Sequence, residues 1–211
     1  MEVITKKYKV YEYKELGEKA KEVVKQWYLD DDFRPSEFTE IYEQDLRNIF
    51  PDSKLNLQYS LNYCQGDGVN IYGELNVDNI LNLPLNHFCG DEFNDLVEYF
   101  TEKELRTIHR YSSECGMDLK LPMNNYYNYC CVDRIDLAEE WENDLWYANY
   151  KNVNKQLLQK FEKYVITIIE RLCADYEKYG YGFFYEVEDE YLCDVCDANG
   201  WRFLENGEYF S

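Results

Sequence analysis

Apolar and polar residues alternate most clearly in two neighbouring segments of the chain. In residues 55–63, leucine and tyrosine occupy every second position and amide or hydroxyl side chains lie between them. Residues 69–77, VNIYGELNV, continue the same alternation. A period of two is typical of strands that bury one face. The sequence therefore predicts two strands joined as a β-hairpin.

The segment between these strands contains Gln65, Gly66, Asp67 and Gly68. It is either a tight turn or a loop that holds a ligand. Glycine tolerates positive φ angles, and an aspartate hydrogen-bonds readily to nearby backbone, so both residue types favour a turn. A phosphate-binding loop would be followed by a helix N-terminus, whereas here a strand follows. We therefore expect a structural turn.

Helical spacing of apolar residues dominates the remainder of the chain. Thr101 and Glu104 have the spacing of a capping box, which predicts a helix that begins at residue 102. Pro35 is tolerated in the first turn of a helix and indicates the start of another. The helices expected from these patterns cover residues 14–29, 35–49, 91–100, 102–111, 133–150, 152–179 and 186–198.

Three further segments have strand character. Residues 3–13 predict a first strand, residues 117–121 and 126–132 a second hairpin, and residues 201–210 a small hairpin that turns at Asn206-Gly207. The expected fold class is α+β, with an antiparallel sheet built from hairpins and packed against several helices, one of them long. We expect one domain, residues 1–211, with the helical part 133–198 as a candidate subdomain.

Charge narrows the choice of partner. The 211 residues include 42 acidic and 22 basic side chains, which give a net charge of −20. Solubility of a small domain needs a magnitude of only about 2–8. Such a chain repels nucleic acid and anionic membranes and attracts basic surfaces. We therefore expect a basic protein as partner, and neither direct nucleic-acid binding nor membrane binding.

The negative charge is concentrated in particular segments. Residues 181–211 contain eight acidic and one basic side chain, and residues 133–150 contain six and one. The alternative interpretation is that these are the solvated faces of amphipathic helices, with charge serving solubility alone. The residues expected to bind a partner are Asp30, Asp31, Asp32, Glu139, Glu140, Glu142, Asp144, Glu186, Glu188, Asp189 and Glu190.

Eight cysteines raise the question of metal binding. Cys193 and Cys196 have the spacing of half a zinc site, but a structural zinc needs four ligands. His87 and Cys89 are the other compact pair of ligand types. Cys196 falls on an apolar helical face, where cysteine is typically a small buried hydrophobe. We expect no metal or other cofactor. The N-terminus lacks a signal peptide, so we expect reduced cysteines in a cytoplasm.

Catalytic motifs are missing from the sequence. Only two histidines occur, and no nucleophile elbow, Walker A motif or dinucleotide-binding fingerprint is present. With 42 carboxylates, any chosen acidic pair is uninformative. We therefore expect a binding protein and not an enzyme.

Two short motifs resemble those of a known group. Residues 59–68 read YSLNYCQGDG and residues 198–207 read ANGWRFLENG. These are similar to a Q-G-D-G hairpin and an A-N-x-x-x-F ending in uncharacterised phage and prophage proteins. In those proteins the residue before Q-G-D-G is more often serine, whereas this chain has Cys64 there. The resemblance implies carriage on a mobile element. Small acidic proteins of that origin include anti-CRISPR and anti-restriction proteins that mimic DNA, so by analogy an inhibitor of host defence is expected.

Three hypotheses follow. In the first, the protein binds the basic nucleic-acid channel of a defence nuclease in the host cytoplasm, foremost a Cas effector, by acidic mimicry of DNA. In the second, it is a metal- or small-molecule-binding accessory protein that uses the hairpin loop and the Cys193–Cys196 pair. In the third, it is a general interaction module of a mobile element.

Overall fold

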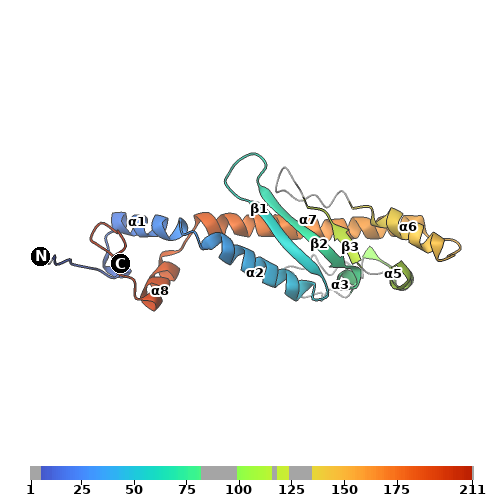
Figure 1. Ribbon diagram of the computed structural model, residues 1–211, viewed down its shortest axis with the longest axis horizontal. Coiled ribbons are helices and arrows are strands. Elements are labelled where there is room, and N and C mark those ends of the chain that lie inside the picture. Colours follow the sequence, from blue (N-terminus) through green and yellow to red (C-terminus); the bar gives the residue numbers. More distant parts are fainter. Residues whose placement is uncertain (1–5, 82–98, 116–117, 124–134, 211) are drawn as a thin grey trace, which may run out of the picture. The chain divides into compact units, whose positions relative to one another are not determined.

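The computed structural model describes residues 6–81, 99–115, 118–123 and 135–210 (Figure 1). Helices and one antiparallel sheet are both present, so the α+β prediction is confirmed. The chain divides into two compact units. The first unit comprises Met1–Phe38 and Tyr179–Ser211, and the second unit comprises Thr39–Lys178. This division does not follow the suggested helical part 133–198, because residues from 179 onward belong with the N-terminal segment.

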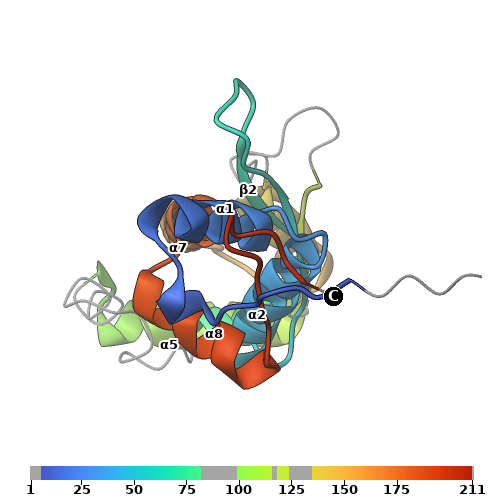
Figure 2. The same ribbon diagram turned by 90° about the vertical axis from the view of Figure 1, so that its left-hand side faces the viewer.

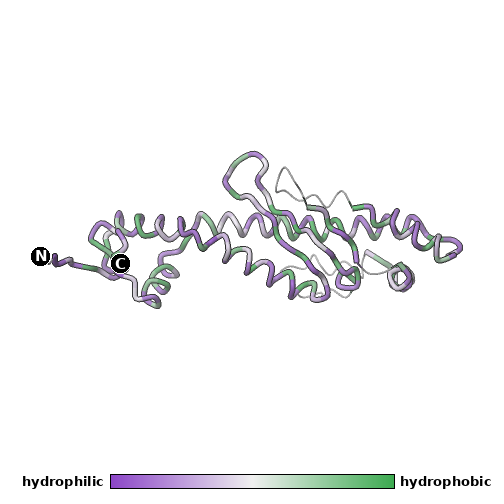
Figure 3. Tube along the Cα trace, viewed as in Figure 1, coloured by the Kyte–Doolittle hydropathy of each residue, from purple (hydrophilic) through white to green (hydrophobic). Residues whose placement is uncertain are grey.

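The sheet lies in the second unit. Strands β1 (Lys54–Ser60), β2 (Gly68–Asn76) and β3 (Asp118–Leu121) are antiparallel neighbours in the order β1-β2-β3. The predicted hairpin is confirmed, and its alternation is visible in the hydropathy of the trace (Figure 3). The register pairs Leu57 with Ile71 and Leu75 with Leu119, which are all buried. One face of the sheet is therefore apolar.

The second unit also contains helices. Their bounds are α3 (Val77–Leu81), α5 (Glu102–Cys115) and α6 (Leu137–Tyr147), together with most of α2 (Arg34–Ile49) and α7 (Lys155–Tyr185). The predicted capping box of α5 is confirmed, because the Glu104 amide donates to Thr101 Oγ1 at 3.3 Å and the Thr101 amide donates to Glu104 Oε2 at 2.8 Å. Residues 133–150 and 152–179 were expected to be helical, and α6 and α7 occupy most of both ranges.

Phe161 of α7 lies at the centre of an aromatic cluster. Its side chain is fully buried, 5.8 Å from the Trp141 ring of α6 and 6.2 Å from the Phe100 ring. Further along α7, Tyr176 donates a hydrogen bond to Asp45 of α2 at 2.6 Å. The long helix therefore has apolar contacts to α6 and a hydrogen bond to α2, and burial of its predicted apolar stripe is confirmed.

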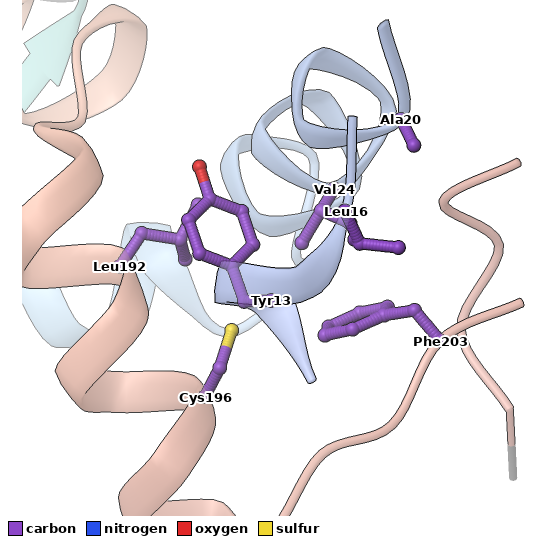
Figure 4. Packing of buried hydrophobic residues seen from close by; sticks show 7 residues of the cluster. All are labelled: Tyr13, Leu16, Ala20, Val24, Leu192, Cys196 and Phe203. Atoms are coloured by element: carbon purple, nitrogen blue, oxygen red, sulfur yellow. The ribbon is translucent and has the colours of Figure 1, made fainter. Parts of the chain in front are cut away.

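The first unit joins the two ends of the chain (Figure 2). It contains a 3-10 turn, η1 (Tyr13–Glu15), helix α1 (Glu18–Leu29) and helix α8 (Asp189–Asn199). The small core of the first unit is drawn from all of these elements (Figure 4). The buried members are Tyr13, Leu16, Ala20, Val24, Leu192, Cys196 and Phe203.

The C-terminal segment closes this core from one side. Phe203 forms isolated bridges with Tyr11 and Tyr209. The turn between Phe203 and Tyr209 is closed by the Gly207 amide, which donates to the Leu204 carbonyl at 2.9 Å. The predicted terminal hairpin is thus confirmed. Tyr209 stacks on Trp27 of α1 with ring centroids 4.9 Å apart, so aromatic packing fixes the hairpin to the helix.

The strand predicted for residues 3–13 is wrong over its described part. Residues 6–10 form neither helix nor strand, Tyr11 forms only its bridge to Phe203, and Tyr13 begins η1. Tyrosine and valine give this segment β-propensity, but it has only one short partner to pair with. Residues 82–98 and 124–134, which include most of one predicted helix and one predicted strand, lie outside the described residues.

Candidate functional site

Two of the three acidic clusters lie in the first unit. Asp30–Asp32 occupy the connection from α1 to α2, and Glu186, Glu188, Asp189 and Glu190 occupy the connection from α7 to α8 and the start of α8. All seven side chains are exposed. Tyr28 and Arg34 flank the first connection and line one cavity with Glu186 and Glu188. The fold therefore brings together two acidic segments that are far apart in the sequence.

Asp189 differs from the other carboxylates of this group because it is held by α1. Its carboxylate lies 2.5 Å from Lys25 Nζ and accepts a hydrogen bond from the Tyr13 hydroxyl at 3.2 Å. The hydrogen bond from Lys25, together with that from Tyr13, lowers the pKa of Asp189 below its usual range. Asp189 therefore stabilises the packing of α8 against α1, and its role is structural more than partner-binding.

Within the part of the chain that the structure describes, Asp30 and Asp31 between α1 and α2 have uncharged hydrogen-bond partners. Gln26 donates to Asp30 at 2.7 Å, and the backbone amide of Phe33 donates to Asp31 at 2.9 Å. Neither these side chains nor Asp32 forms an ion pair with a described residue. Their negative charge is consequently available to a basic partner.

The third cluster lies on α6, in the second unit. Glu139, Glu140 and Asp144 are exposed and form no ion pair within the described ranges, whereas Glu142 pairs with Lys155 at the start of α7. Lys155 and Glu142 also line a polar cavity of about 440 Å³ between α6 and α7. One cation thus neutralises part of this cluster, and the remaining carboxylates face solvent.

Two aromatic side chains at the end of α6 extend this acidic surface. Trp146 is 70% exposed and Tyr147 is 75% exposed, and their rings contact edge to face at 5.1 Å. Large aromatic residues are seldom left so open to water, and they are enriched among residues that dominate the energy of protein interfaces. No pattern in the sequence predicted the exposure of this pair, since it depends on where α6 ends.

The Gln65–Gly68 segment is a turn, as predicted. Asp67 accepts hydrogen bonds from the Asn62 amide at 2.6 Å, the Cys64 amide at 2.9 Å and the Ser60 hydroxyl at 2.9 Å. These donors lower the pKa of Asp67 although partial burial opposes them. Gly66 has a φ of 94° and Gly68 a φ of 150°. The Asp67 carboxylate therefore stabilises the turn through hydrogen bonds to residues of the turn itself.

One detail of the predicted strand is wrong at its end. Tyr63 was expected on the apolar face, but β1 ends at Ser60 and Tyr63 is 68% exposed with a φ of 55°. The hydrogen bonds to Asp67 draw the chain into the turn before Tyr63 can extend the strand.

Cys193 and Cys196 belong to the core of the first unit. Cys196 is buried among Tyr13, Leu192 and Phe203, and Cys193 packs against the same cluster. Burial raises the pKa of the Cys196 thiol to about 11, which disfavours the thiolate that a metal requires. The described residues hold no group of three or more histidine, cysteine or acidic side chains placed to bind a metal ion. His87 and Cys89 lie outside the described residues.

Comparison with known proteins gave no relative. No family model, curated protein or solved structure matches this chain. Within the part of the chain that the structure describes, no helix combines the length and the apolar character needed to span a bilayer.

Proposed function

We propose that the protein is an anti-defence inhibitor of phage or mobile-element origin. It binds the basic nucleic-acid channel of a defence nuclease, foremost a Cas effector, and blocks entry of DNA. The observation that carries this proposal is a set of exposed carboxylates on α6 and beside the cavity of the first unit that form no ion pair with any described residue. The resemblance of the two sequence motifs to phage proteins supports the same origin.

The physical basis is substitution of carboxylates for phosphates. Duplex DNA carries one negative charge per ~1.7 Å of its axis, and proteins that bind it line their channels with lysine and arginine. An acidic protein meets the same cations and is drawn to them at long range. Complementary charge mainly raises the association rate and orients the two partners, and it adds less to the affinity. Trp146 and Tyr147, next to the carboxylates of α6, supply apolar contact area that phosphates lack.

The test is a DNA-cleavage assay with purified Cas effectors. Titration of the protein is expected to abolish cleavage at a fixed molar ratio and to displace labelled DNA from the effector. The variant Glu139→Gln/Glu140→Gln/Asp144→Asn is expected to inhibit at least about tenfold less well, since each lost charge contact weakens binding. A panel of effectors that all cleave normally at excess protein would contradict the proposal.

A matched control separates local from overall charge. Glu40, Asp118 and Glu170 are also exposed carboxylates of the second unit. The variant Glu40→Gln/Asp118→Asn/Glu170→Gln removes the same net charge and is expected to inhibit like the wild type. Equal losses in both variants would show that net charge, and not the α6 surface, is responsible.

A further inference from the structure

A cavity of about 370 Å³ lies entirely within the first unit, beside Arg34. Its volume falls in the usual range of small-molecule sites, about 300–1,000 Å³. Tyr28, Phe183, Val187 and Tyr191 form its apolar wall, and Glu186 and Glu188 supply carboxylates. The sequence singled out Glu186 and Glu188 but did not place them beside Tyr28 and Arg34, because the lining residues come from two distant segments, 28–34 and 183–191.

Arg34 is the unusual residue of this cavity. It is only 6% exposed, and its guanidinium carbon lies 4.8 Å from the Tyr28 ring centroid and 4.2 Å from that of Phe183. Among the described residues, the guanidinium donates one hydrogen bond, to the Phe183 carbonyl, and its Nε atom has no partner. It forms no ion pair with any described carboxylate. A buried cation of this kind lacks the counter-charge that normally offsets its desolvation.

The geometry restricts how a ligand can reach this cation. The N–H groups of a guanidinium lie in its plane, and the Tyr28 and Phe183 rings crowd its central carbon, so an acceptor must approach its edge. A carboxylate fits such an edge by accepting parallel hydrogen bonds. A simple anion is nevertheless disfavoured, because Glu186 and Glu188 line the same cavity and repel it.

We propose that this cavity binds a small zwitterion, a free α-amino acid with a large apolar or aromatic side chain. Its carboxylate pairs with Arg34, its ammonium group pairs with Glu186 or Glu188, and its side chain packs against Tyr28, Phe183 and Tyr191. A zwitterion satisfies both signs of charge in the cavity at once. The wall then removes the apolar side chain from water.

Isothermal titration calorimetry with L-phenylalanine and L-leucine tests this site, and three analogues test each contact. Phenethylamine lacks the carboxylate, 3-phenylpropionate lacks the ammonium group, and L-alanine lacks the large side chain. We expect saturable binding of phenylalanine or leucine with one site, and affinity at least about tenfold lower for each analogue. N-acetylphenylalanine, which resembles the end of a peptide, is expected to bind as weakly as 3-phenylpropionate.

Variants test whether the measured heat of binding arises from the cavity. Arg34→Gln and the double variant Glu186→Gln/Glu188→Gln are each expected to weaken binding at least about tenfold, whereas Asp194→Asn, an exposed α8 position outside the cavity, is expected to leave binding unchanged. Far-UV circular dichroism checks that each variant is folded. If Arg34→Gln fails to fold, Glu186→Gln/Glu188→Gln and the analogue series still decide. Absence of saturable heat at millimolar phenylalanine and leucine, or 3-phenylpropionate that binds as well as phenylalanine, overturns the proposal.

Discussion

Gly207 gives the sharpest test of how the C-terminal segment packs in the first unit. Its φ is +90°, and a Cβ atom built there would lie 2.3 Å from the carbonyl oxygen of Ala20 and 3.0 Å from Val23 Cβ. Gly207→Ala therefore has to adopt an unfavourable backbone conformation, which costs about 1–2 kcal/mol. It also has to move the segment off α1, which weakens the stacking of Tyr209 on Trp27, worth about 0.5–1.5 kcal/mol. We expect a total loss of about 1.5–3.5 kcal/mol.

Gly200 provides the matched control for this substitution. It also has a positive φ, +66°, but a Cβ atom there would meet nothing within 4 Å. Gly200→Ala is expected to cost only the backbone part, about 1–2 kcal/mol. Urea unfolding followed by circular dichroism gives the free energy of unfolding of both variants. Equal losses for the two would refute the close contact between the segment and α1.

The remaining predictions concern acidic groups and one helix. The pKa of Asp189 is lowered in the folded protein, so its contribution to stability is complete above its unfolded pKa of about 3.9 and is lost as pH falls through the lower folded value. Urea midpoints measured at decreasing pH should therefore fall less steeply below pH ~4 in Asp189→Asn than in the wild type. Parallel curves for the two proteins would contradict this. The hydrogen bond to Asp67 raises the pKa of the Cys64 thiol, so Asp67→Asn should speed alkylation of Cys64 by iodoacetamide, as followed by mass spectrometry, and an unchanged rate would disprove the link. Gly182 lies inside α7 with open space around its Cα, so Gly182→Ala should raise the free energy of unfolding by about 1 kcal/mol, and a loss of stability would indicate a contact at this position.

Local signals in the sequence predicted most of the fold. The alternation in residues 55–63 and 69–77 predicted the hairpin because one face of the sheet is buried, and the Thr101–Glu104 spacing fixed where α5 begins. The failure at residues 3–13 has the opposite cause. Strand propensity is realised only where a partner strand exists, and pairing partners are a property of the whole fold.

The candidate site was predictable only in part. The acidic residues could be read directly, but their roles depend on neighbours that are distant in the sequence. Asp189 became a structural ion because Lys25 and Tyr13 lie beside it, more than 160 residues away. Arg34 looked like an ordinary charged residue near a helix start. Only the fold places Phe183 against it, with no described carboxylate paired to it.

Competition between the protein and DNA for a basic nucleic-acid channel is the decisive test of inhibition by DNA mimicry. The measurement is the affinity of the protein for an inhibited effector nuclease, made with and without the target DNA and at increasing salt. We expect DNA and protein to exclude one another and the affinity to fall steeply with salt. We also expect Glu139→Gln/Glu140→Gln/Asp144→Asn to weaken binding and Glu40→Gln/Asp118→Asn/Glu170→Gln to leave it unchanged. Simultaneous binding of protein and DNA, with an affinity that salt leaves unchanged, would contradict DNA mimicry.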